Sequence, residues 1–342
     1  MTQQGARDDD DRHPVWDVVL LADEPSVLVL ANLCWHLEQG AQEVHLYLDA
    51  PQSPSARTIT AMVQALPGVR VTECDDRFWQ GLNGGRPVLQ TRRQTLVATH
   101  AYRRSRADWM LNLDADEFLW MPAGQRFGDE LADAAGHGAY LALPTRERAY
   151  VRGPVRALFE GVFRGPLPRR DPVPPDLANQ EPFIARGVSG HAAGKACTRT
   201  GLRAVLRPHA PRVDGALPPS RPARNAVMLH FDGLTPLHWM LKLRRYGAHD
   251  PAHWSRFLAE HRRAQVAFAR DHGNDARALR ELHDRLKSVA DPAAMQAAGL
   301  VRAYEFDPAP ALARWLGKPL DLSADAFDDA LRLAYPDLAH DL

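Results

Sequence analysis

The chain has 342 residues, and its 42 Lys and Arg residues balance 42 Asp and Glu residues. This balance excludes a nucleic-acid binder with a uniformly basic surface, and three scattered cysteines are too few for a disulfide framework or a thiolate zinc site. No run of about 18 apolar residues occurs, so we expect no membrane-spanning helix. Residues 1–13 are polar and lack the apolar core of a signal peptide, which predicts a disordered tail on a cytoplasmic protein.

Apolar runs alternate with helical patterns in the first half of the chain. Residues 15–22 predict a buried strand, Pro25 then suits the first turn of a helix that ends near Gly40, and residues 44–48 predict a second strand. A strand, a helix and a strand within about 35 residues form a βαβ unit, which implies a parallel pair. The pattern continues with a helix over residues 55–66, a strand over 69–73, a helix over 91–105 and a strand over 109–113.

Two aspartates directly follow strands of this predicted sheet. Asp49 comes after residues 44–48, and Asp114 comes after residues 109–113. Open parallel sheets bind their ligands beyond the carboxyl ends of the strands. The first 120 residues therefore predict a mostly parallel α/β sheet of the nucleotide-binding type, flanked by helices.

The rest of the chain combines proline-rich loops with helices. Six prolines over residues 166–182 and five over residues 208–222 predict long loops. Thr235 and Pro236 then begin a predicted helix, and further helices are expected over residues 251–273 and 275–289. We expect one α/β domain over residues 14–234 and a C-terminal helical extension over residues 235–342.

The sequence Asp114-Ala115-Asp116-Glu117-Phe118 carries the strongest chemical signal. Residues two apart point the same way in an extended chain, so we expect Asp114 and Asp116 to project together. Paired carboxylates suit Mn²⁺ or Mg²⁺, which would neutralise charge on a diphosphate leaving group. A solvated acidic turn is the alternative. A phosphatase with the first Asp as nucleophile is disfavoured, because Glu117 and Phe118 follow the motif and three strands precede it.

A glycine-flanked segment runs from Gly190 through His191 to Gly194 and Lys195. It is not a Walker loop, because Ser189 stands where a glycine is required and Ala follows the lysine. His191 and Lys195 are candidates to contact phosphate by charge and through backbone N–H groups. A tight turn without a ligand is the alternative.

A histidine and a basic group complete the set of candidates. His230 ends an apolar run, where its neutral imidazole would supply a third metal ligand or simply lie buried in the core. Lys242, Arg244 and Arg245, with Trp239 nearby, are candidates for contact with an anionic membrane surface or a lipid-phosphate acceptor. The other arginine pairs, such as Arg262 with Arg263, are interpreted as solvated helix faces.

Taken in order, these segments resemble the family-2-like glycosyltransferases of bacteria. The opening strand and helix are followed by ADWMLNLDADEFLW, then SGHAAGKA, then VMLHFDG before a helix. The resemblance covers residues 15–246, and its most specific piece is the Trp-x-x-x-Leu-Asp-Ala-Asp-Glu-Phe sequence that begins at Trp109. It implies a GT-A type, Rossmann-like fold with an Asp-x-Asp metal motif.

The resemblance also implies roles for the candidate residues. Asp114 and Asp116 would hold Mn²⁺ or Mg²⁺ on the sugar-nucleotide diphosphate, and His230 would be a late histidine facing the metal. Glu24 and Asp49 would line the nucleotide pocket. Both lie in segments that depart from the usual family pattern: Ala-Asp-Glu replaces Lys-Asn-Glu after the first strand, and Ala-Pro-Gln follows Asp49.

His191 and Lys195 would lie near the diphosphate or the acceptor. An inverting reaction also needs a base for the acceptor hydroxyl proton. Glu117 and Asp232 are the candidate carboxylates, and Glu117 is also a candidate brace of the motif.

We therefore expect a metal-dependent glycosyltransferase that moves a sugar from a UDP- or GDP-sugar to a hydroxyl of a saccharide or lipid-linked acceptor. The resemblance places this reaction in surface polysaccharide or glycolipid synthesis, with no nucleic acid and at most peripheral contact with the inner membrane. A nucleotidyltransferase that uses a nucleoside triphosphate is one alternative, although no glycine-rich loop follows the first strand. A catalytically inactive binding protein of the same fold is the other.

Overall fold

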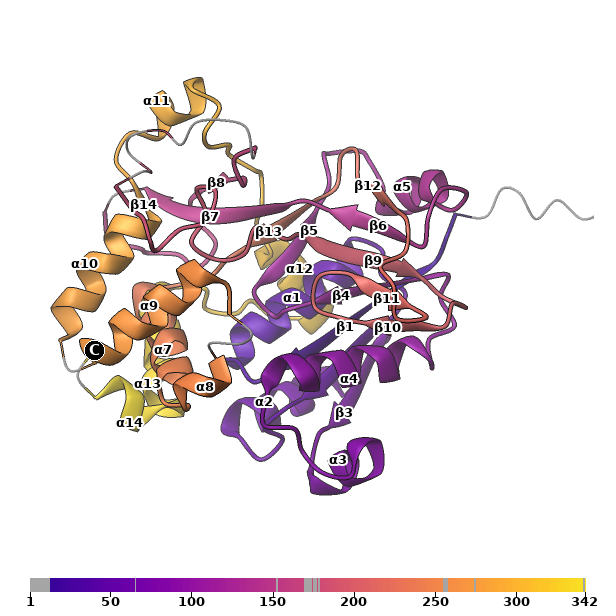
Figure 1. Ribbon diagram of the computed structural model, residues 1–342. Helices are drawn as coiled ribbons and strands as arrows, with labels where there is room; N and C mark the ends of the chain where they lie inside the picture. The colour runs from indigo at the N-terminus through magenta and orange to yellow at the C-terminus, as the bar shows by residue number, and fades with distance from the viewer. Residues whose placement is uncertain are drawn as a thin grey trace, which may run out of the picture.

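The computed structural model describes residues 13–64, 66–151, 153–168, 174, 177, 179–254, 258–273, 275–340 and 342. The disordered tail predicted over residues 1–13 therefore lies outside the described residues, apart from His13. A seven-stranded sheet in the order β12-β6-β9-β4-β1-β2-β3 forms the centre of the molecule (Figure 1).

The first half of the chain builds the parallel part of this sheet, as predicted. Its parallel strands are β1 (Trp16–Ala22), β2 (Val44–Leu48), β3 (Val69–Glu73) and β4 (Trp109–Leu113). The helices between them are α1 (Ser26–Glu38), α2 (Pro54–Val63), α3 (Asp76–Asn83) and α4 (Gln90–Tyr102). Alternate residues of β1 point to opposite faces: Val18 and Leu20 pack with α1 and α2, whereas Val19 and Leu21 pack with α3 and α4.

The other half of the sheet contains antiparallel pairings, so the sheet as a whole is mixed. Strand β9 (Lys195–Arg199) runs antiparallel to both of its neighbours, β4 and β6 (Tyr140–Leu143). The edge strand β12 (Ser220–Pro222) lies within the second predicted loop and pairs parallel with β6. Between β6 and β9 the chain contributes strands to a second sheet, described below, so these two are not the strands of a single βαβ unit.

A second, smaller sheet has the order β14-β7-β13-β5, with β8 on β7. Its strands are β5 (Glu117–Trp120), β7 (Thr145–Val151), β8 (Val162–Arg164), β13 (Val227–His230) and β14 (Ser288–Val289). Strand β13 lies between β5 and β7, which places His230 opposite Glu117 on one side and opposite Glu147 on the other. The separate pair β10 (Ala204–Leu206) and β11 (Pro211–Val213) is antiparallel.

The remaining helices lie mostly in the last third of the chain, and α7 to α10 group on one side of the molecule (Figure 1). They are α5 (Phe127–Ala134), α7 (Pro236–Gly247), α8 (Pro251–Trp254), α9 (Glu260–Asp271), α10 (Ala276–Lys287), α11 (Pro292–Ala297), α12 (Ala309–Leu316), α13 (Ala324–Ala334) and α14 (Pro336–Ala339). The single helix predicted over residues 251–273 is two helices, because Leu258 and Ala259, just before α9, are not helical. The helix predicted over residues 275–289 ends at Lys287, and β14 follows.

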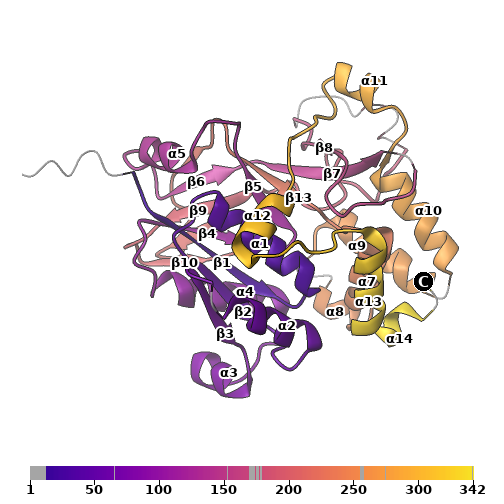
Figure 2. The same cartoon turned by 180° about the vertical axis from the view of Figure 1, so that it is seen from behind.

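The last helices return to the first part of the fold. Helix α12 packs against α1 (Figure 2), and Leu312 and Phe327 belong to the same core cluster as Val18 and Leu30. Among the described helices, none combines the length and the apolar character that crossing a bilayer requires.

Candidate active site

A tight turn, and not an extended chain, carries Asp114, Ala115 and Asp116. The Glu117 N–H donates to the Asp114 carbonyl at 3.1 Å, and the Asp114 N–H donates to Glu117 Oε2 at 2.8 Å. The Asn32 amide on α1 donates to the Ala115 carbonyl at 3.1 Å and to the Glu117 carbonyl at 2.8 Å. The prediction of an extended motif was therefore wrong, because β4 ends before it and β5 begins after it.

Asp114 and Asp116 consequently have different neighbours. The Asp114 carboxylate, 31% exposed, accepts from Lys195 Nζ at 2.8 Å and from the Gln94 amide. Lys195 also lies 2.7 Å from Glu117 Oε2. Burial alone would lower the pKa of Lys195, but the carboxylates of Asp114 and Glu117 outweigh it and raise that pKa. Lys195 is therefore a permanent cation that links the motif to β9.

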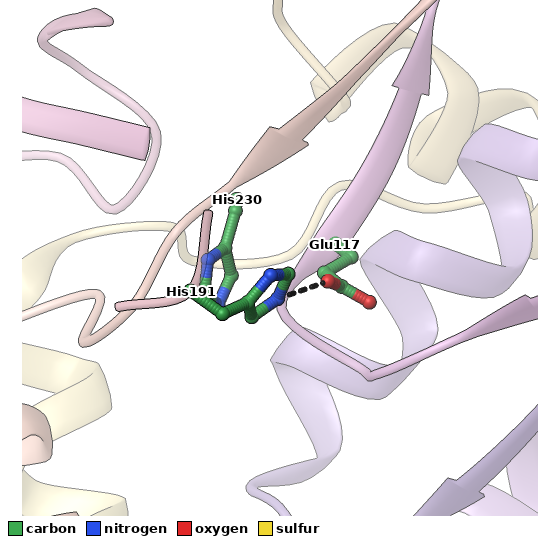
Figure 3. A group of neighbouring side chains, drawn as sticks. All are labelled: Glu117, His191 and His230. Carbon is green, nitrogen blue, oxygen red and sulfur yellow. Dashed lines mark hydrogen bonds and ion pairs between the residues drawn. The ribbon is translucent and has the colours of Figure 1, made fainter. Parts of the chain in front are cut away.

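Glu117 is fully buried, and its carboxylate stabilises the turn by accepting the hydrogen bond from the Asp114 N–H. Its Oε1 lies 3.0 Å from His191 Nε2, and the imidazole of His191 lies beside that of His230, with 4.7 Å between the ring centroids (Figure 3). Burial raises the pKa of Glu117, but Lys195 and His191 outweigh burial and hold the pKa well below its usual range. Ligand atoms of Glu117, His191 and His230 lie within 4.8 Å of one another.

The two glycines around His191 owe their identity to close packing. A Cβ on Gly194 would lie 1.8 Å from the carbonyl oxygen of Leu143, and a Cβ on Gly190 would lie 2.8 Å from Glu147 Oε2 and 3.1 Å from His230 Cε1. The Gly190 N–H donates to Glu147 Oε2. The backbone of this segment therefore binds the carboxylate of Glu147. Its glycines allow the segment to pack closely against Leu143 on one side and against Glu147 and His230 on the other.

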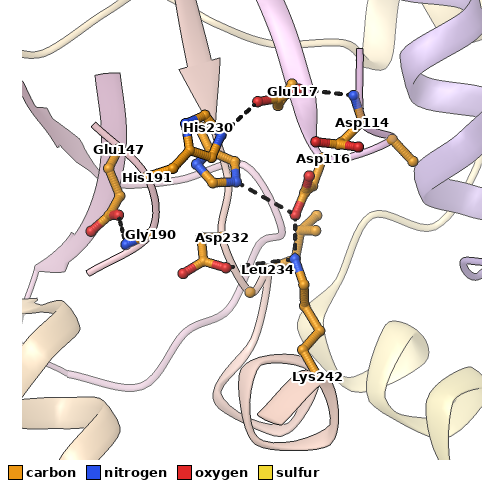
Figure 4. Close-up of polar contacts among 12 residues, drawn as sticks. Asp114, Asp116, Glu117, Glu147, Gly190, His191, His230, Asp232, Leu234 and Lys242 are labelled. Carbon is orange, nitrogen blue, oxygen red and sulfur yellow. Dashed lines mark hydrogen bonds and ion pairs between the residues drawn. The ribbon is translucent and has the colours of Figure 1, made fainter. Parts of the chain in front are cut away.

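Asp116, His230 and Asp232 form a second group, with ligand atoms within 4.8 Å of one another (Figure 4). His230 Nε2 lies 3.9 Å from Asp116 Oδ2, and His230 Nδ1 is buried with no hydrogen-bond partner among the described residues. Lys242 Nζ, on α7, lies 2.6 Å from Asp116 Oδ2 and 3.5 Å from Asp232 Oδ1. Asp114 belongs to neither group.

Further buried ion pairs surround Asp232. Its Oδ1 accepts from Arg262 on α9 at 2.7 Å, and its Oδ2 accepts from Lys287 at the end of α10 at 2.9 Å. Burial raises the pKa of Asp232, but Arg262 and Lys287 outweigh it and hold the pKa well below its usual range. Glu147 is neutralised in the same way, by Arg164 at 2.8 Å and Lys287 at 3.5 Å. The prediction that Arg262 lies on a solvated helix face was wrong.

The two residues predicted for the nucleotide pocket lie at the carboxyl ends of β1 and β2. Asp49 pairs with Arg93 and Arg86, each at 2.9 Å. Glu24 lies 3.1 Å from His238 Nε2. Burial raises the pKa of Glu24, but His238 outweighs it and lowers the pKa to about 2.

The basic residues of α7 do not form an exposed patch. Trp239 is fully buried, Lys242 points into the site, and Arg244 donates to the carbonyls of Gly273 and Leu338. Arg245 lies 3.0 Å from Asp23, beside Glu24. His238, Lys242 and Arg245 are spaced four and three residues apart, so one face of α7 meets both Asp116 and the loop after β1.

The sequence-based prediction assigned Lys242 to a membrane or lipid-phosphate contact and did not name Lys287 or Glu147. One signal for the lysines was present, because the chain holds only four lysines: Lys195, Lys242, Lys287 and Lys318. The first three are the ones that pair with carboxylates in the site. Glu147 gave no such signal, because its place depends on the pairing of β7 with β13.

No family model and no curated protein matches the chain. Among solved structures, S. aureus TarS (residues 1–349) is similar with a TM-score of 0.35 and 12% identity, over 77% of this chain and 73% of that one. HddC from Yersinia pseudotuberculosis is similar with a TM-score of 0.28 and 10% identity, over 63% of this chain and 77% of that one. Likeness this remote leaves the function to be argued from the site itself.

A hollow of about 520 Å³ lies between α3 and α4, lined by Asp75, Phe78, His100, Arg104 and their neighbours. It shares no lining residue with the carboxylate groups described above.

Proposed function

We propose that this protein is a glycosyltransferase that moves a sugar from a nucleotide-sugar donor to an acceptor hydroxyl. The observation that carries the proposal is the group of Asp116, His230 and Asp232 next to the carboxyl end of β4. Nucleotides bind beyond the carboxyl ends of parallel strands. Cation ligands at this edge are therefore well placed to meet the diphosphate of a donor.

The donor set of this group fits Mn²⁺ or Mg²⁺. Two carboxylates are hard-oxygen ligands and an imidazole is a borderline one, a combination that suits Mn²⁺ in particular. His230 Nε2, the imidazole nitrogen nearest this group, lies 3.9 Å from Asp116 Oδ2 and points toward it. A divalent cation held there supplies electrostatic stabilisation of the departing diphosphate. We propose Asp116, His230 and Asp232 as its ligands.

The nucleotide would bind along the ends of β1, β2 and β4. Asp49 and Glu24 are proposed to contact the donor, with Arg93 and His238 holding their carboxylates in place. Asp114 and Lys195 form the edge of the site nearest β4, and Lys195, held by Asp114 and Glu117, is proposed to lie near the diphosphate. His191 lies beside them, which suits a contact with either the diphosphate or a saccharide or lipid-linked acceptor.

Glu117 and Asp232 are less suited to the role of base than to the role of anchor. Both oxygens of each carboxylate are engaged by cations or N–H donors. A carboxylate whose pKa lies far below neutrality accepts a proton weakly. We therefore propose that Glu117 positions Lys195 and His191, and that Asp232, as a proposed metal ligand, is itself held in place by Arg262 and Lys287.

Thermal unfolding with a panel of nucleotides tests the proposal. A ligand that binds only the folded chain stabilises it by about 2.7 kcal/mol at a hundredfold excess over its Kd. We expect UDP- or GDP-sugars to raise the Tm with Mn²⁺ and to lose that effect in EDTA, and the active mixture to release a nucleoside diphosphate. A shift with triphosphates alone, with release of pyrophosphate, would favour a nucleotidyltransferase. No shift at all would favour an inactive binding protein.

A further inference from the structure

Lys242 lies where a cation bound by the candidate metal group would lie. Its ammonium is 2.6 Å from Asp116 and 3.5 Å from Asp232, between the two carboxylates of that group (Figure 4). Each of these carboxylates belongs to a different element, one to the β4–β5 turn and one to the segment after β13. The positive charge of Lys242 thus lies between the two carboxylates.

The two carboxylates differ in what else neutralises them. Asp232 also pairs with Arg262 at 2.7 Å and with Lys287 at 2.9 Å. Among the described residues, the ion-pair partners of Asp116 are Lys242 and, at 3.9 Å, His230. Lys242, at 2.6 Å, is the closer of the two, and its ammonium carries a full positive charge. The charge of Asp116 is therefore balanced by Lys242.

We propose that Lys242 is an internal cation that competes with the divalent metal for Asp116, so that metal binds only as the lysine side chain withdraws. The inference rests on the function proposed above, because it concerns the same site. A divalent ion and an ammonium that share one carboxylate repel each other strongly at such distances. Binding of one cation therefore weakens binding of the other.

The chemistry of lysine suits such an exchange. An ammonium is a compact point charge on a flexible four-carbon stem, whereas a guanidinium binds carboxylates through a rigid two-pronged fork. The chain uses arginine for most of its positive charges and lysine at only four positions, and Lys242 is one of the four. Its side chain is 19% exposed, so water reaches the stem. The carboxylate of Glu24, which also favours the charged form of Lys242, offers a second partner.

Mn²⁺ affinity measured without nucleotide tests the proposal. Titration of the full chain, followed by electron paramagnetic resonance of free Mn²⁺, gives the Kd for the wild type, for K242M and for K242Q. K242Q keeps a hydrogen-bond donor near Asp116 and guards against misfolding of K242M. We expect both variants to bind Mn²⁺ about 100-fold more tightly than the wild type, because the competing charge is gone.

K318M is the matched control, because Lys318 is exposed and the substitution is the same. We expect it to leave the Kd unchanged, and we expect the double variant D116N/K242Q to lose the gain. Equal Kd values for wild type and both Lys242 variants, or no Mn²⁺ binding by any of them, would overturn the inference. A gain in Mn²⁺ affinity without any nucleotide-dependent shift in Tm would overturn the proposed function alone.

Discussion

The two aspartates of the Asp114-Ala115-Asp116 turn have unequal parts in the site. Asp114 is partly exposed and shares Lys195 with Glu117, so two carboxylates pair with a single ammonium. Asp116 is buried and meets His230 and Lys242 across the site. Because the turn separates their directions, substitutions at the two positions need not have the same effect.

Asp116→Asn is expected to abolish the Mn²⁺-dependent rise in Tm and to reduce sugar transfer by roughly 100-fold or more, since it removes a ligand of the cation proposed to stabilise the diphosphate. Nucleotide-dependent Tm shifts and the release of nucleoside diphosphate measure the two effects, and circular dichroism checks the fold. Asp133→Asn, at an exposed surface pair with Arg224, is the matched control. Full activity of D116N would rule out the assigned role.

At the scale of elements, α1 and β5 are joined through the imidazole of His36. The Leu119 N–H donates to His36 Nε2 at 3.1 Å, so the neutral ring carries its proton on Nδ1, which lies 2.8 Å from the Asn32 carbonyl. The same Asn32 holds the Ala115 carbonyl. Protonation of His36 would break the bond to β5, next to the site.

The pH dependence of stability follows from this bond. Burial lowers the pKa of His36 from 6.5 to about 4, so below pH 6.5 the unfolded chain takes up a proton that the native chain refuses. The free energy of unfolding should therefore fall by about 2 kcal/mol between pH 7 and pH 5 on account of this residue. Urea unfolding of His36→Gln should show a shallower loss, whereas the exposed control His137→Gln should match the wild type. Equal pH slopes for H36Q and wild type would contradict the assignment.

The elements themselves were predictable where local pattern decides. The bounds of β2 and β4 follow from short apolar runs, and Thr235 caps α7 through the His238 N–H as its sequence indicates. The antiparallel β9 was not predictable, because strand pairing across more than 80 residues leaves no local pattern. Helix α3 was missed although Asp75 caps it.

The same division holds within the site. Residues that stand at strand ends, such as Asp116 and His230, were found from the sequence because the pattern of the strands indicates where those ends meet. Lys287 was not found, and Lys242 was assigned to a membrane contact, because the sequence of a helix does not show which element its face packs against. Glu147 is reached only through the register of β7 on β13.

At the scale of the whole molecule, basic residues after position 235 neutralise buried carboxylates that lie before it. Lys242, Arg262 and Lys287 pair with Asp116, Asp232 and Glu147. The last helices also cover α1 with apolar side chains, among them Leu312. The predicted domain boundary near residue 235 thus falls between buried charges and their partners.

A chain that ends at residue 234 is therefore expected not to fold on its own. Removing one partner of a buried ion pair costs about 3–5 kcal/mol, and three such losses approach the whole stability of a typical protein, about 5–15 kcal/mol. Thermal denaturation of this shortened chain, compared with the full one, should show no cooperative transition. A sharp transition in the shortened chain would show that residues 14–234 are an independent domain.

The spacing of residues along helix α7 matters to the site as much as their identity. His238, Lys242 and Arg245 share a face of this helix and reach Glu24, Asp116 and Asp23. Each residue of an α-helix turns about 100° from the one before. One extra residue between His238 and Lys242 would therefore swing both later side chains away from their carboxylates, although every residue of the site would still be present.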